Sequence, residues 1–330
     1  MRDQVQRLAR SLPPPGDHGG DGATVAAALG LYAEEVLDLS VSLNPVAPDL
    51  LPLVAAHLED LRRYPDPTRA TVLLAEAMGV DPSSLLLTNG GAESIALVAA
   101  EIGGRAVEPD FSLYPRDTSV ATGDSPIWRS NPHNPSGLLA VDTDEAGVWD
   151  EAFFPLATGR WTRGDPGAVV VGSLTKLLAL PGMRLGYLLG DPDLVERCKR
   201  RQPEWSVGSI PAAALPEMLS VVDLAKWSKE VAELREELVA VLRTHGLEPR
   251  PSDANWVLVD SPGLRERLAP RGVVVRDCSS FGLGGVARVA VPSPEGLEVL
   301  DAALSATSDR SGGSRSSATA QSAGRQERTR

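Results

Sequence analysis

The chain has 330 residues, of which 42% are hydrophobic and 23% charged, a composition that excludes fibrous, collagenous and wholly disordered proteins. Asp and Glu outnumber Lys and Arg by 44 to 32, and the resulting net charge of −12 argues against a nucleic-acid partner, which needs a basic surface. No apolar run approaches the roughly 18–20 residues of a membrane helix, and residues 1–11 lack the apolar core of a signal peptide. We therefore predict a cytoplasmic protein that binds neither nucleic acid nor a membrane.

The cysteine and histidine positions argue against a metal site. Cys198 and Cys278 lie far apart in the sequence, and the four histidines are scattered. Neither a disulfide framework nor a zinc-binding spacing is present. We expect no metal.

The predicted elements begin after residues 1–22, whose Pro and Gly clusters predict a flexible N-terminal arm. Helical spacing of apolar residues and β-rich apolar runs then alternate along the chain. In chain order we predict helices at residues 68–78, 93–101, 221–243 and 294–304, and strands at residues 84–88, 168–172, 184–190, 256–260, 273–276 and 286–291. This alternation predicts an α/β fold with a mostly parallel sheet. Residues 305–330 are small and polar and predict a disordered tail.

The stretch around Lys176 carries the strongest chemical signal. The apolar strand Val169-Val170-Val171-Gly172 leads into Ser173, Thr175 and Lys176. A lysine at the end of a buried strand loses solvation, which lowers its pKa and makes it a candidate Schiff-base nucleophile. Taken alone, the same pattern also suits a surface lysine at the start of a helix.

Two further segments carry polar groups that suit a phosphate and a ring. Residues 85–94 read as a strand, a glycine turn and a helix, and such a helix start presents free backbone N–H groups to an anion. Ser173, Thr175 and Arg184 are candidate donors to the same phosphate. Asp150 ends a short strand and Asn134 lies in a proline-rich turn, although a helix cap and an ordinary turn residue are alternatives for these two.

Six short motifs in a fixed order carry a family resemblance. They are NGGAE (89–93), PDFSLY (109–114), NPHNPSG (131–137), DEAF (150–153), SLTK (173–176) and PGMRLGY (181–187). In this order they resemble the fold type I, class I/II aminotransferase superfamily, whose cofactor is pyridoxal 5′-phosphate. The resemblance runs from about residue 18 to residue 304.

The resemblance implies roles for individual residues around this cofactor. Lys176 would bind it covalently and later move a proton. Asp150 would pair with the pyridine nitrogen, Asn134 would bond the ring oxygen, and Phe111 would stack on the ring. The cofactor phosphate would be held by Gly91, Ala92, Ser173, Thr175 and Arg184. Tyr64 resembles a tyrosine that reaches the cofactor phosphate of a neighbouring subunit, which implies a homodimer.

The same resemblance implies substrate-binding residues. Arg288 matches an arginine that binds the substrate α-carboxylate, and Arg276 matches one that binds a substrate phosphate, although a strand-end arginine facing solvent is the alternative for Arg276. Asn44, in the string Leu37 to Pro45, is assigned to substrate binding as well. Two arginines suit a doubly anionic substrate.

The branch with this second arginine contains histidinol-phosphate aminotransferase and the threonine-phosphate decarboxylase of cobalamin biosynthesis. Three short cues favour a decarboxylase: His18-Gly19-Gly20-Asp21, the string from Leu37 to Pro45, and RDCSSFGL at 276–283. An aminotransferase of histidinol-phosphate type remains the alternative, and a non-catalytic cofactor-binding relative is the second.

The resemblance also implies a domain plan. It predicts a large cofactor-binding domain at residues 23–205 with a mainly parallel sheet of the seven-stranded type, and a small α+β domain at residues 206–304.

The sequence departs from the family pattern at two places. Only residues 115–130 separate the motifs PDFSLY and NPHNPSG, a shorter connection than in the family, so we expect at least part of one βα unit of the sheet to be abbreviated. Phe153 stands where the family often has a tyrosine that bonds the cofactor ring, which leaves that bond to Asn134.

Overall fold

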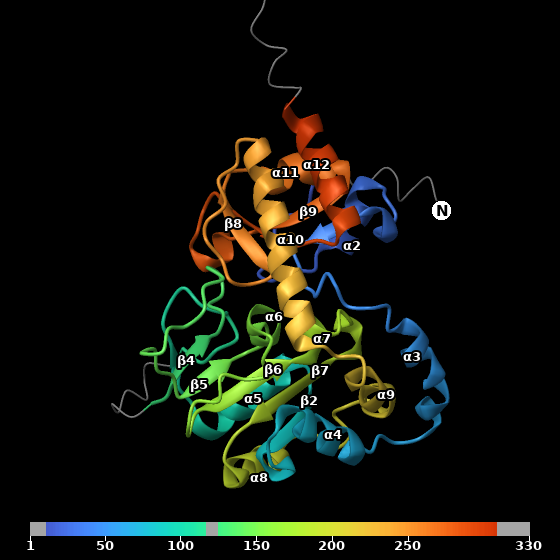
Figure 1. The fold of residues 1–330 in the computed structure, drawn as a ribbon, viewed down its shortest axis with the longest axis vertical. Helices are drawn as coiled ribbons and strands as arrows, with labels where there is room; N and C mark the ends of the chain where they lie inside the picture. Colours follow the sequence, from blue (N-terminus) through green and yellow to red (C-terminus); the bar gives the residue numbers. More distant parts are fainter. Residues whose placement is uncertain (1–10, 117–124, 309–330) are drawn as a thin grey trace, which may run out of the picture.

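Two sheets, one in each half of the molecule, are joined by the long helix α10 (Leu224–Thr244) (Figure 1). The computed structural model describes residues 11–116 and 125–308. In these residues no helix is both long enough and apolar enough to cross a membrane. The predictions for residues 1–10 and for most of the tail fall outside the described residues. Helix α12 (Pro294–Ser308) continues past the predicted end of the folded part.

The larger sheet has six strands in the described residues, in the order β2-β7-β6-β5-β4-β3. Their bounds are β2 (Leu85–Asn89), β3 (Arg105–Ala106), β4 (Ile127–Ser130), β5 (Val148–Asp150), β6 (Val169–Ser173) and β7 (Leu185–Leu189). Strands β3 to β6 pair in parallel, whereas β7 is antiparallel to both β6 and β2. Strands β2, β4, β5 and β6 therefore end at one edge of the sheet.

The large sheet differs from the seven-stranded prediction by one strand. Strands β3 and β4 are direct neighbours in the sheet, with Arg105 opposite Ile127, and only residues 107–126 connect them. A crossover between two parallel strands takes about a dozen residues, so an additional strand with a crossover on each side does not fit into this connection. The abbreviated segment in the sequence thus agrees with a large sheet that has six strands in the described residues.

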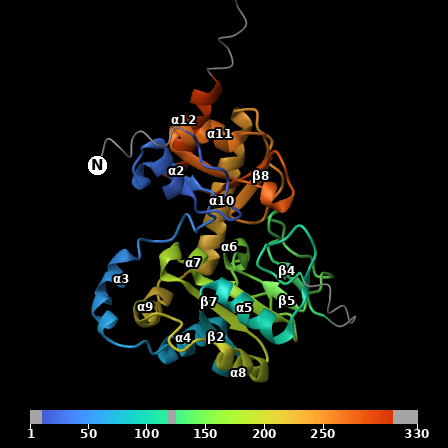
Figure 2. The ribbon, with the colours of Figure 1, turned by 180° about the vertical axis from the view of Figure 1, so that it is seen from behind.

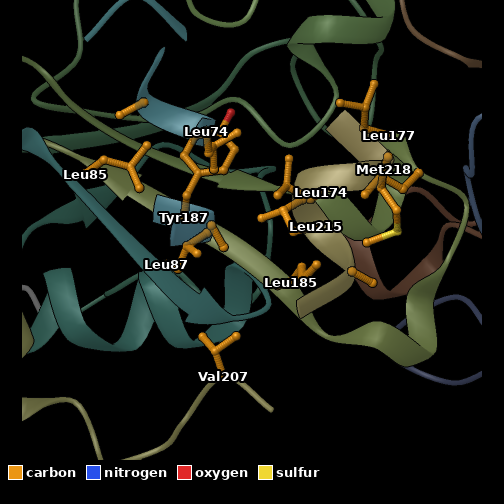
Figure 3. Close-up of a cluster of buried hydrophobic side chains, with 14 of the residues drawn as sticks. Leu74, Leu85, Leu87, Leu174, Leu177, Leu185, Tyr187, Val207, Leu215 and Met218 are labelled. Atoms are coloured by element: carbon orange, nitrogen blue, oxygen red, sulfur yellow. The ribbon is translucent and has the colours of Figure 1, made fainter. Parts of the chain in front are cut away.

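Side chains alternate between the two faces of this sheet, and each face has its own apolar core. Leu85, Leu87 and Tyr187 face the helices α4 (Thr68–Met78) and α9 (Ser209–Leu219), as Figure 3 shows for part of this core. The opposite face packs against α5 (Gly91–Ile102) and α8 (Pro192–Arg201) (Figure 2). The sheet is thereby covered by helices on both sides, which is why its strands read as continuous apolar runs.

The smaller sheet has the order β1-β9-β10-β8. Its strands are β1 (Leu37–Leu39), β8 (Trp256–Asp260), β9 (Val273–Asp277) and β10 (Val286–Ala290), and it packs against α10 and α12. Strand β1 pairs in parallel with β9. Together with α2 (Gly22–Leu29) it brings the start of the chain into the C-terminal half of the molecule.

The packing therefore divides the chain differently from the predicted boundary between residues 205 and 206. Helix α9 belongs to the core of the large sheet, and so do Leu224 and Trp227 at the start of α10. Leu238 and Leu242 at the end of α10 belong to the core of the small sheet. One amphipathic helix thus packs against both cores. The periodicity of its apolar residues does not show that its two ends pack against different sheets.

The predicted strands and helices are confirmed to within a few residues, and α4 agrees with its prediction at both ends. Strands β1, β3 and β4 were missed because they have three, two and four residues and lack a recognisable period. Residues 11–21 have no helix or strand, as predicted, yet they are bonded to the small domain rather than free.

Candidate functional site

A cavity of about 210 Å³ lies where the carboxyl edge of the large sheet meets the small sheet. Ligands of α/β proteins commonly bind at this edge, because loops and helix starts converge there. The structure brings most of the predicted site residues to the cavity wall: Gly91, Ala92, Phe111, Asn134, Asp150, Ser173, Thr175, Lys176, Arg184, Arg276 and Arg288. They come from strands and strand ends of both sheets that are distant in sequence.

Lys176 lies on the short helix α7 (Leu174–Leu177), directly after β6. Burial lowers the pKa of its ammonium group to about 8, and repulsion by Arg288, Arg184 and Arg276 acts in the same direction. Asp150 opposes this shift through its negative charge. A lysine with such a pKa is partly neutral near physiological pH and therefore nucleophilic.

Asp150 ends β5 and is held by two donors. One carboxylate oxygen accepts the backbone N–H of Ala152 at 3.0 Å, and the other accepts the hydroxyl of Tyr114 at 2.8 Å. Burial raises the pKa of Asp150 to about 6, and the hydroxyl of Tyr114 counteracts that rise. The role of Tyr114 was not predicted from the sequence, although its place in the motif PDFSLY, three positions after Phe111, is a usable signal.

We expect Tyr114→Phe to raise the pKa of Asp150, because the carboxylate loses a donor that stabilises its charged form. A hydrogen bond to a charged group contributes about 1.5–3 kcal/mol, so we expect a rise of roughly one to two pH units. Carbon-13 NMR titration of the aspartate carboxyls measures this shift. Tyr32→Phe, at a tyrosine that is 75% exposed, is the control. An unchanged pKa of Asp150 in Tyr114→Phe would show that the hydroxyl does not stabilise the carboxylate.

A phosphate-sized cradle forms where β2 turns into α5. The first N–H groups of a helix have no partner within it, and Gly91 and Ala92, which open α5, line the cavity. Gly90 adopts φ +76°, which favours glycine, and a Cβ there would overlap the guanidinium of Arg184. Ser173 and Thr175, whose hydroxyls lie 2.7 Å apart, complete the cradle.

Gly186 allows the backbone of β7 to approach the turn at Gly90 and Gly91 closely. A Cβ at Gly186 would overlap the backbone at Gly90 and Gly91, which cannot move without displacing the start of α5. We expect Gly186→Ala to lower the free energy of unfolding by about 1–3 kcal/mol, measured by thermal or urea unfolding. Gly182→Ala is the control, because a Cβ at Gly182 meets open space. Equal stability of the two variants would refute the close packing.

Arg276 and Arg288 stand opposite one another on β9 and β10. Both are buried, and both donate to neutral groups. Arg288 donates to the amide oxygen of Asn134 at 2.9 Å and to Ser40 O. Arg276 donates to Asp17 O at 2.9 Å and to the hydroxyl of Ser280. The Nε atom of each has no hydrogen-bond partner in the described chain. Burial and the charge of Arg276 lower the pKa of Arg288 to about 9.

Two buried like charges on paired strands are costly unless an anion lies between or beside them. The small domain thus contributes two guanidinium groups to the cavity that suit a ligand with negative charge. Each guanidinium also lies over an aromatic ring. The Cζ atom of Arg288 is 5.0 Å from the ring centroid of Trp256, and that of Arg276 is 4.6 Å from the ring centroid of Phe281.

Two predicted residues do not line the cavity. Asn44 is buried, and its amide donates to Leu177 O at 2.9 Å and accepts from Val46 N at 3.1 Å. Its own N–H donates to Lys176 O at 3.0 Å, so Asn44 braces the turn that carries the lysine. Tyr64 is 78% exposed and stacks on Trp205 with ring centroids 4.4 Å apart. Their predicted contacts with substrate and with a neighbouring subunit's cofactor stay predictions.

The chain is similar to known enzymes over most of its length. Residues 146–304 match the family model described as aminotransferase class I and II. A histidinol-phosphate aminotransferase of Mycobacterium tuberculosis is 30% identical over 85% of this chain and 90% of that protein. The chain belongs to the class I and II aminotransferase family. The threonine-phosphate decarboxylase of Salmonella typhimurium is 29% identical over 87% of this chain and 95% of its own.

A solved structure confirms the fold. The crystal structure of a putative aminotransferase from Burkholderia pseudomallei has a TM-score of 0.72 and 26% identity, over 82% of this chain and 98% of that chain. The resemblance found in the sequence is thereby confirmed, and so is the fold type I architecture. This aminotransferase-family protein is an enzyme that depends on pyridoxal 5′-phosphate.

The cavity fits this cofactor. A phosphate suits the cradle at Gly91, Ala92 and Arg184, where any residue larger than glycine at position 90 would intrude. An aldehyde suits the buried, partly neutral Lys176, and a basic ring nitrogen suits the carboxyl of Asp150.

Proposed function

We propose that this enzyme removes the carboxyl group of a phosphorylated amino acid of the L-threonine O-3-phosphate kind. The observation that carries the proposal is the facing pair of buried arginines, Arg276 and Arg288, which lack carboxylate partners in the described chain. A substrate with one carboxylate and one phosphate supplies one anion to each. The similarity to the Salmonella typhimurium decarboxylase supports the same choice.

We assign the cofactor contacts as follows. Lys176 binds the cofactor aldehyde, Asp150 holds a proton on the ring nitrogen, Asn134 donates to the ring oxygen, and Phe111 covers one ring face. The cofactor phosphate is held by Gly91, Ala92, Ser173, Thr175 and Arg184. When bound, pyridoxal phosphate supplies an electron sink for the pair of electrons released at the substrate Cα.

The remaining task of the protein is to orient the substrate and to handle protons. Arg288 holds the substrate carboxylate and Arg276 the substrate phosphate, which together fix the rotation of the substrate about its Cα. That rotation decides whether the carboxyl group or the α-hydrogen is lost, since small changes of geometry have large effects on rate. Once carbon dioxide has left, Nζ of Lys176 in its ammonium form would donate a proton to Cα and become the neutral amine.

Transamination of the histidinol-phosphate type is the second candidate function. The relative from Mycobacterium tuberculosis supports it, because it has the higher identity of the two. In that case Arg276 would hold the substrate phosphate, and Arg288 would hold the carboxylate of the amino acid that takes part in the other half of the reaction.

We propose further that the enzyme acts as a homodimer. The helix α3 (Leu51–Ala56) and the residues after it stand away from the large sheet in Figure 1. They expose four large apolar side chains: Leu51, Leu58, Leu61 and Tyr64. Several exposed apolar side chains on one surface segment suit a protein interface. A partner there would allow Tyr64 to contribute to the second active site.

The experiment that tests the proposed reaction is mass spectrometry of the products formed from L-threonine O-3-phosphate by the cofactor-loaded enzyme. We expect loss of carbon dioxide and formation of the aminopropanol phosphate, with a proton replacing the carboxyl group and the cofactor unchanged. Conversion of the cofactor to its pyridoxamine form, with a keto product and no loss of carbon dioxide, would establish an aminotransferase instead. No reaction would contradict the substrate assignment, and histidinol phosphate would be tested next.

A further inference from the structure

One guanidinium holds both ends of the segment that covers the small-domain side of the cavity. We call residues 13–21 the strap. Arg265, on α11 (Leu264–Leu268), is only 2% exposed. Its Nη1 donates to Pro13 O at 2.9 Å, and its Nη2 donates to the carboxylate of Asp21 at 2.6 Å. The strap has no helix or strand of its own, so its order depends on such bonds.

Asp21 does not act as its position in the chain suggests. It is the N-cap residue of α2, where an aspartate side chain usually accepts a backbone N–H of the first turn. No such bond is present, and the carboxylate points to Arg265 instead. Asp21 thus forms an ion pair with a buried arginine in place of its usual cap bond, while the N–H of Gly22, the first residue of α2, donates to the carboxylate of Asp38 at 3.1 Å.

The middle of the strap reaches the substrate end of the cavity. His18 and Gly19 line the cavity, and Asp17 O accepts the Nη2 of Arg276 at 2.9 Å. Gly19 lies so close to Ser40 O that a Cβ would overlap it, and Gly20 N donates to the Ser40 hydroxyl at 2.8 Å. The strap therefore both walls the cavity and fixes one amino group of the guanidinium that faces the ligand.

We propose that Arg265 and Asp21 are positioning residues that latch the strap over Arg276. Neither lines the cavity among the described residues, so they act through Asp17, His18 and Gly19. The effect on substrate binding rests on the proposed function, whereas the latch itself does not. A guanidinium suits this task because its planar fork bonds two acceptors at once, which a lysine ammonium on a flexible stem does less well.

Hydrogen exchange of the cofactor-loaded enzyme, followed by mass spectrometry, tests the latch. We compare the wild type with Asp21→Asn and Arg265→Gln. Asp21→Asn changes a partly exposed side chain and remains informative if Arg265→Gln does not fold. We expect faster exchange in residues 13–21 and unchanged exchange in α10. Unchanged exchange in the strap, or a rise spread over the whole chain, would overturn the latch.

The matched control is Arg267→Gln on the same helix. Among the described residues, the guanidinium of Arg267 donates to the turn before α11, to Pro262 O and to the Ser261 hydroxyl, both at 2.6 Å. This variant removes one arginine of α11 without touching the strap. We expect wild-type exchange in residues 13–21, and exchange as fast as in Asp21→Asn would overturn the assignment to Arg265.

Steady-state kinetics tests the positioning role. With L-threonine O-3-phosphate we expect Asp21→Asn to raise KM about tenfold and to change kcat less than about twofold, since the strap contacts the binding arginine and not the lysine. Asp21→Glu, which keeps the charge, should restore most of the affinity. Faster exchange in the strap without a rise in KM would overturn the positioning role. Failure of the proposed function would instead appear in the wild type, as absence of turnover, while the exchange result still decides the latch.

Discussion

We expect Lys176→Ala to lower turnover by about 10²- to 10⁴-fold or more and to abolish the visible absorbance of the covalently bound cofactor. Nζ is the one amine at the carboxyl edge of the large sheet in the described chain, and burial lowers its pKa to about 8. Removing it takes away both the group that binds the cofactor and the group that moves the proton, and a lost acid–base group alone accounts for the lower part of this range. Absorbance spectra and single-turnover rates measure the two losses separately.

Lys199→Ala is the control for this prediction. Lys199 is exposed on α8 and lies outside the cavity wall, so its removal should leave spectrum and rate unchanged. If the cofactor absorbance survived in Lys176→Ala and disappeared in Lys199→Ala, the assignment of the lysine would be wrong.

The second large effect concerns the two substrate arginines. We expect Arg276→Gln to lower kcat/KM about 100-fold or more for L-threonine O-3-phosphate and to leave the weak reaction with unphosphorylated L-threonine nearly unchanged. A charge-assisted hydrogen bond contributes about 1.5–3 kcal/mol, and a guanidinium can form two with a phosphate. Steady-state rates with both substrates measure the difference.

Arg288→Gln serves as the matched comparison. Arg288 lies opposite Arg276 on the paired strand and donates to Asn134. We expect its loss to lower kcat/KM for both substrates to the same extent, because both carry the carboxylate. If Arg288→Gln lowered kcat/KM for the phosphorylated substrate alone, Arg288 would be the residue that binds the phosphate. If Arg276→Gln lowered kcat/KM equally for both substrates, the phosphate role of Arg276 would be wrong.

The link between Asn134 and Arg288 joins the two halves of the site. Asn134 belongs to the loop after β4, and its amide oxygen accepts from Arg288 on the small sheet at 2.9 Å. Its backbone N–H is held at 2.7 Å by Ser130, whose hydroxyl donates to the buried Asp110 at 2.6 Å. A direct hydrogen bond therefore fixes the proposed cofactor amide relative to the proposed carboxylate arginine, which suits a reaction whose outcome depends on their relative placement.

The amino-acid sequence determined the chemistry of this protein. The apolar strands, the glycine turn before α5 and the lysine after β6 are local patterns, and the order of the six motifs by itself indicates the family. The abbreviated connection before Asn131 was also visible in the sequence, and the large sheet has six strands in the described residues. These features depend on neighbours in the chain, which a sequence displays directly.

The tertiary structure decided what depends on residues distant in sequence. The bond from Tyr114 to Asp150, the facing of Arg276 and Arg288, and the hold of Arg265 on both ends of the strap each join separate elements. Burial of Asp150 and Lys176 shifts their pKa values because packing removes water, and periodicity does not measure that loss. The division of α10 between two cores was likewise not visible in the sequence. A helical pattern shows which face of a helix is apolar but not which elements pack against that face.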